Sequence, residues 1–135
     1  MAIRKRWLYF ILILITIPLG AGSREIILPG WLQTNAGDVL AATCIFFGVR
    51  FIAINKKLTS VAVVSYIICI AIETLQLYQA PWIVQLRSNY ITGTLLGHGF
   101  LWSDWLWYAI GVVIGACIGF YLEKLFTKKC SSNTK

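Results

Sequence analysis

The sequence predicts an all-α integral membrane protein, a four-helix bundle that crosses the bilayer four times. The chain of 135 residues is 59% hydrophobic and only 13% charged, whereas soluble domains average about 45–50% and about 25%. A soluble domain of this size could not bury so much apolar surface. Stretches close to the length of about 20 residues that spans a bilayer occur at 7–23, 38–55, 58–80 and 104–122.

The apolar stretches are continuous rather than alternating, which favours helices over a membrane β-barrel. The first stretch follows the basic residues 4–6 and ends among small residues at 20–22. A cleaved signal peptide has the same order of features, but its apolar core is shorter. We therefore expect a first transmembrane span. A single domain is predicted over 1–126, and the polar residues 127–135 are predicted to form a disordered tail.

The net charge of +7 first suggests a nucleic-acid-binding protein, but the positions of the basic residues favour topology. With both termini in the cytoplasm, ten of the twelve basic residues fall inside and only Arg24 and Arg87 fall outside. This agrees with the positive-inside rule. Of the acidic residues only Glu123 falls inside. We expect a bacterial cytoplasmic (inner) membrane protein, membrane lipid as a partner, and no nucleic acid.

Polar and small residues recur at helical spacing on two of the stretches. The third stretch carries one stripe, made of Tyr66, Cys69, Glu73, Gln76 and Ala80. The fourth carries another, made of Asp104, Tyr108, Gly111, Gly115 and Gly119. Glycines four residues apart let helix backbones approach closely. We expect the three glycines to pack inside the chain, with an oligomer through the fourth span as the alternative.

Glu73 is the strongest candidate for a site residue, because it lies about two turns inside the third stretch. An ionised carboxylate there costs at least about 2.5 kcal/mol unless it is paired or hydrated. The competing interpretation is a Glu that only holds the bundle together. Asp38 and Asp104 begin the second and fourth stretches, so either could instead be a helix N-cap. Arg24 and Arg87 are the basic residues nearest to this group.

The segment 88–103 has no formal charge and is rich in glycine. We interpret it as an interfacial or re-entrant segment over the polar cluster, with His98 as a polar residue rather than a catalyst. Aromatic residues close to the span ends indicate an interfacial belt: Tyr9, Trp31, Trp82, Trp102, Trp105 and Trp107. The cysteines show no metal-binding or redox spacing, so neither a metal nor a cofactor is predicted.

Several short motifs together resemble a known family. They are Ser23-Arg24, Gly37-Asp38, Glu73-x-x-Gln76, Pro81-Trp82 with Arg87, and Leu96-Gly97-x-x-Phe100-x-x-x-Asp104-x-x-x-Tyr108-x-x-Gly111. In this order they resemble the small bacterial four-span membrane proteins of domain-of-unknown-function family 2809. More distantly they look like the VanZ-like proteins, which are linked to glycopeptide resistance. The resemblance implies a bacterial membrane protein and, by analogy alone, a role in the cell envelope.

The preferred functional hypothesis is a binding protein with an outward-facing polar pocket. It would hold a lipid headgroup or a polyprenyl-linked envelope precursor with Arg24, Asp38, Glu73, Gln76, Arg87, Asp104 and Tyr108. The arginines suit a phosphate. One alternative is an accessory or structural subunit without a ligand. Another is an intramembrane hydrolase or transferase in which Glu73 and Asp104 act as acid and base. A proton pathway is disfavoured, since the inner half of the spans offers no second relay group beyond Arg50.

Overall fold

The fold is a set of long apolar helices. The computed structural model describes residues 2–23, 30–76, 78, 80–89 and 102–132. Its helices are α1 (Ala2–Ser23), α2 (Gly30–Ile52), α3 (Leu58–Gln76), α4 (Pro81–Arg87) and α6 (Asp104–Ser132). Of these, α1, α2, α3 and α6 are long and apolar enough to cross a membrane, and the described residues contain no strand. The predicted all-α membrane bundle is thus confirmed, and the chain is a multi-pass membrane protein.

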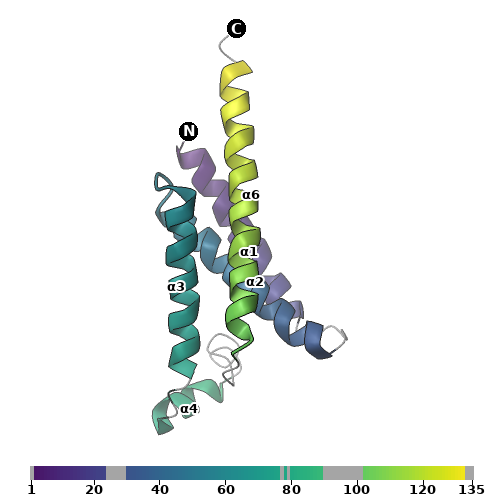
Figure 1. Cartoon of the computed structure of the whole chain (residues 1–135), viewed down its shortest axis with the longest axis vertical. Coiled ribbons are helices and arrows are strands. Elements are labelled where there is room, and N and C mark those ends of the chain that lie inside the picture. Colours follow the sequence, from purple (N-terminus) through teal and green to yellow (C-terminus); the bar gives the residue numbers. More distant parts are fainter. Residues whose placement is uncertain (1, 24–29, 77, 79, 90–101, 133–135) are drawn as a thin grey trace.

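Helix α2 lies at the centre, where it contacts α1, α3 and α6, while α3 also contacts α6. Figure 1 shows α3 and α6 running along the long axis and α1 and α2 crossing them obliquely. The start of α1, the α2–α3 turn and the end of α6 lie at one end, which we call the basic end. The end of α3, the start of α6 and α4 lie at the opposite end, the carboxylate end.

Several helix boundaries differ from those that hydropathy predicts, among them the start of α1 at Ala2 rather than at Trp7. Helix α2 begins at Gly30 rather than at Asp38, because a helix can include the polar residues 33–35 that hydropathy leaves out. Helix α3 ends at Gln76 rather than at Ala80, since Ala80 precedes a proline and adopts an extended backbone (φ −61°, ψ 145°). Helix α6 continues through residue 132, so residues 127–132 are helical where a disordered tail was predicted.

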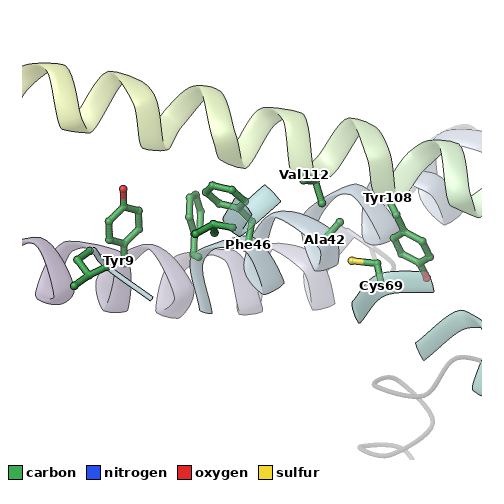
Figure 2. Close-up of a cluster of buried hydrophobic side chains, with 9 residues drawn as sticks. Tyr9, Ala42, Phe46, Cys69, Tyr108 and Val112 are labelled. Carbon is green, nitrogen blue, oxygen red and sulfur yellow. The ribbon is translucent and has the colours of Figure 1, made fainter. Parts of the chain in front are cut away.

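The core is a column of side chains between α6 and the other spanning helices (Figure 2). Phe46, Phe47 and Val61 belong to it and are at most 1% exposed. Tyr9 is also buried and packs against Phe47, with ring centroids 6.1 Å apart. The prediction that Tyr9 belongs to an interfacial belt is therefore wrong, because its ring points into the bundle. Apolar side chains on the outer faces of α1, α3 and α6 remain exposed, as a surface facing lipid requires.

The glycine stripe of α6 faces α2. A Cβ atom at Gly111 would lie 2.3 Å from the carbonyl oxygen of Val39 and 2.7 Å from the Cβ of Ala42. At Gly115 it would meet the ring of Phe46 at 2.8 Å. At Gly119 the nearest atom would be Leu58 Cδ1, at 3.1 Å. The stripe is thus filled from within the chain, and the close approach of the two backbones depends on the missing side chains.

Candidate functional site

The candidate site is built around Glu73, which projects from the last turn of α3 and is only 1% exposed. It belongs to the buried stripe of α3, together with Ser65 and Cys69. The four-residue spacing of these positions turns all three side chains inward. A carboxylate so deeply buried within a membrane bundle needs polar neighbours.

Tyr108 of α6 supplies one such neighbour, because its phenolic O–H donates to Oε2 of Glu73 at 2.8 Å. Tyr108 is itself buried and lies beside Cys69 at the carboxylate end of the core column (Figure 2). The hydrogen bond links α3 to α6 through two residues that the sequence had selected separately. It replaces part of the hydration that the carboxylate loses on burial.

Two further carboxylates lie near this pair. Asp38 of α2 and Asp104 of α6 are both within electrostatic range of the Tyr108 phenol, as is Glu73. Asp104 is 9% exposed, while Asp38 is partly buried. Helices α2, α3 and α6 therefore each contribute one acidic residue to a single cluster, which we call the carboxylate cluster: Asp38, Glu73, Asp104 and Tyr108.

The helix boundaries show where each aspartate lies relative to the start of its helix, and hence whether it can be an N-cap. Asp38 lies about two turns inside α2, which begins at Gly30, so the N-cap interpretation of Asp38 is wrong. Asp104 is the first residue of α6, where a negative charge is favoured by the helix dipole. The backbone carbonyl of Ser103 accepts from Leu106 and Trp107, and the Ser103 hydroxyl donates to the Asp104 carboxylate at 3.2 Å.

Backbone and hydroxyl contacts hold the helices that carry the cluster. The single hydroxyl hydrogen of Thr43 in α2 is shared between two carbonyl oxygens, that of Gly111 in α6 at 2.9 Å and that of Val39 in its own helix at 2.8 Å. Tyr66 of α3 donates to the carbonyl of Trp105 in α6 at 3.3 Å. Each contact joins α6 to a neighbour within one or two turns of Tyr108, so the position of the phenol is fixed by both α2 and α3.

For the remaining predicted site residues the structure describes the backbone at most. Arg24 and His98 lie outside the described residues, as does most of the predicted re-entrant segment. The backbone of Gln76 ends α3, and that of Arg87 ends α4. The structure thus brings together Asp38, Glu73, Asp104 and Tyr108 from the predicted set. Among the residues that are described, no group of three His, Cys, Asp or Glu side chains is arranged to hold a metal ion.

A second polar group, which the sequence did not single out as a site, lies at the basic end. Arg50 of α2 is only 4% exposed and forms an ion pair with Glu123 of α6. Its Nη1 also donates to the carbonyl oxygens of Lys56 (2.6 Å) and Ala53 (3.3 Å) in the α2–α3 turn. The sequence signal for it is a basic residue inside an apolar stretch, which by itself indicates only topology. The group joins α2, α6 and the turn into one unit.

Comparison with known proteins identifies the family. No solved structure matches the chain. Residues 27–112 match the family described as "Protein of unknown function (DUF2809)". The match covers close to two thirds of the chain and includes α2, α3, α4 and the first turns of α6, hence all four members of the carboxylate cluster. The chain, a multi-pass membrane protein with a carboxylate cluster around the buried Glu73, therefore belongs to the DUF2809 family.

Proposed function

We propose that the chain binds the polar headgroup of a lipid, or of a lipid-linked cell-envelope intermediate, at the carboxylate cluster. The observation that carries the proposal is the burial of Glu73, 1% exposed, with a hydrogen bond from Tyr108. Burying a charged side chain in a membrane bundle costs free energy, and charged residues found there usually have a functional role. A role in binding explains why two aspartates lie near the same phenol.

The chemistry of the cluster favours a headgroup that donates hydrogen bonds. Carboxylates accept from sugar hydroxyl groups and from ammonium groups. The sequence also predicts Arg24 and Arg87 close to the cluster, and we propose that they bind a phosphate group, since guanidinium groups bind phosphate oxygens bidentately. A phosphate-linked sugar or amine presents both kinds of group. A polyprenyl-linked envelope precursor and an amine-bearing phospholipid are therefore the two ligand classes that we propose.

The proposed location is the bacterial inner membrane, with the basic end in the cytoplasm. Arg4, Lys5, Lys56 and Lys57 lie at the basic end, and cytoplasmic flanks of spans carry an excess of such residues. The carboxylate end would then face outward, where lipid-linked envelope intermediates are used.

The test is mass spectrometry of lipids that co-purify with the full chain, compared between wild type and Glu73→Gln. Glutamine keeps a carbonyl that accepts the Tyr108 hydrogen bond but removes the negative charge. The variant should fold and should lose one lipid class by at least about tenfold, since a hydrogen bond to a charged group contributes about 1.5–3 kcal/mol. Thr74→Val is the matched control, because Thr74 is exposed next to Glu73 and bonds only its own helix.

Two results would contradict the proposal. One is an identical lipid profile for wild type, Glu73→Gln and Thr74→Val, which would favour an accessory or structural subunit without a ligand. The other is chemical change of a candidate lipid during incubation with wild type but not with Asp104→Asn. That outcome would favour the intramembrane hydrolase or transferase in which Glu73 and Asp104 act as acid and base.

A further inference from the structure

A hollow at the basic end has a chemistry unlike that of the carboxylate cluster. It has a volume of about 350 Å³ and lies between the first turns of α1 and the last turn of α2. Its walls are Ile3, Arg6, Trp7, Phe10 and Phe51. Ligand sites in proteins range from about 300 to about 1,000 Å³, so the hollow is large enough for part of a lipid.

The shape of the hollow follows from helical spacing and from aromatic packing. Ile3, Trp7 and Phe10 recur at steps of four and three residues and share one face of α1. The Trp7 and Phe10 rings meet edge to face with centroids 5.7 Å apart, and Phe10 lies 6.2 Å from the ring of Phe51 on α2. Phe51 therefore closes the hollow from the neighbouring helix. The aromatic contacts give it rigid apolar walls.

Arg6 is the only lining residue with a charge. It is exposed, and so are Ile3 (74%) and Trp7 (62%). Neighbouring basic side chains face elsewhere: Lys5 lies over the ring of Phe126, 5.7 Å from its centroid, and Arg50 is paired with Glu123. The hollow thus has almost wholly apolar walls, to which Arg6 contributes carbon atoms of its side chain, while the residue as a whole remains exposed.

We propose that this hollow binds one anionic phospholipid, with an acyl chain against the aromatic walls and the phosphate on Arg6. An apolar slot matches an acyl chain, and a guanidinium matches a phosphate through paired N–H···O bonds. The positive charge of Arg6, the one basic residue that lines the hollow, favours a negative headgroup over a zwitterionic one. This site is independent of the proposed headgroup site, which lies at the other end of the bundle.

The experiment is native mass spectrometry of the full chain in detergent with added phosphatidylglycerol or phosphatidylcholine of identical acyl chains. Wild type should bind the first phosphatidylglycerol about fivefold more tightly than phosphatidylcholine, as expected for one basic residue close to a headgroup. Arg6→Gln should reduce this preference to less than about twofold. Arg4→Gln should preserve it, because Arg4 has the same charge, lies two residues away and does not line the hollow.

A second pair of variants tests the apolar walls. Phe10→Ala should weaken binding of both lipids, whereas Phe120→Ala, on the exposed face of α6, should weaken neither. Equal losses for Arg4→Gln and Arg6→Gln would overturn the proposal, because they would show general attraction to the basic end. Equal behaviour of the two Phe variants would also overturn it. So would displacement of phosphatidylglycerol by glycerol 3-phosphate, since that result would show a site for free phosphate esters rather than lipid.

Discussion

Thr43 on α2 donates its hydroxyl hydrogen to the backbone carbonyl of Gly111 on α6 at 2.9 Å, at a position where α6 packs tightly against α2. A Cβ at Gly111 would lie only 2.3 Å from the Val39 carbonyl oxygen. The hydrogen bond therefore depends on the glycine, because only a residue without a side chain at position 111 lets α6 come this close to α2.

Gly111→Ala should destabilise the bundle by about 1–3 kcal/mol, because the added methyl group forces α6 away from α2. Gly48→Ala is the control, since a Cβ there meets nothing within 4 Å, and it should be neutral or slightly stabilising. The measurement is unfolding of the purified protein in mixed micelles of mild detergent and SDS. Equal stability of the two variants would contradict the close packing.

Thr43→Val should destabilise by about 0.6 kcal/mol, the average for interhelical hydrogen bonds in a membrane protein. Valine keeps the shape but removes the hydroxyl that reaches Gly111. Thr43→Ser, which keeps the hydroxyl, should retain the coupling to Gly111 in a double-mutant cycle. In a double-mutant cycle of Thr43→Val and Gly111→Ala, the hydrogen bond should contribute little once the alanine has moved α6 away. The loss of stability in the double variant should therefore be smaller than the sum of the two single losses.

Tyr108→Phe should destabilise by about 1–3 kcal/mol, because Oε2 of Glu73 loses its donor while buried. Tyr121→Phe makes the same change on the same helix at a side chain that is 63% exposed, so its effect should stay within about 0.5 kcal/mol. Adding Glu73→Gln to Tyr108→Phe should restore part of the loss, because a neutral amide is cheaper to bury than a carboxylate. Thermal unfolding in detergent compares all three.

The ion pair between Arg50 and Glu123 should show a coupling energy of about 1–3 kcal/mol in a double-mutant cycle with Arg50→Gln and Glu123→Gln. The Arg50 side chain is 4% exposed and that of Glu123 is 33% exposed, so solvent screens only one partner. Lys124→Gln, at the exposed neighbour of Glu123, should change stability by less than about 0.5 kcal/mol. Additive losses would mean that the pair contributes nothing of its own.

The proposed orientation predicts that a fluorescent protein fused to the C-terminus folds in the cytoplasm and that alkaline phosphatase fused there stays inactive. Changing Lys56 and Lys57 to Gln removes two basic residues from the α2–α3 turn and should weaken the bias. Reporter fusions to wild type and to this variant give the measurement. An active phosphatase on the wild-type chain would reverse the proposed sides.

The spans were predictable because length and apolarity are read directly from sequence. The ends of the spans were less predictable. Hydropathy begins the second span at Asp38, but a helix can also include polar residues, and α2 begins at Gly30. Pro81 is a helix breaker, and its effect on Ala80 explains the early end of α3.

The sequence predicts which residues of the site share a helix face, but not which residues on different helices contact each other. Helical spacing selected Glu73 on one stripe and Tyr108 on another, and their hydrogen bond joins the two. Nothing in a single sequence states which stripes meet, because that depends on helix crossing. Arg50 and Glu123 are far apart in sequence, and charge counting treated each as a marker of sidedness, so their pairing required the fold.

The aromatic middle of the bundle separates the two polar ends. Figure 2 shows Phe46 in the core column between Tyr9 on one side and Tyr108 on the other. Phe47 and Val61 belong to the same buried cluster, and the buried hydroxyl of Ser65 bonds to its own helix. The two polar groups therefore lie at opposite ends of the bundle, and no hydrogen bond described here joins them. Substitutions at the carboxylate end would leave in place the contacts of Arg50 that join α2, α6 and the α2–α3 turn at the basic end.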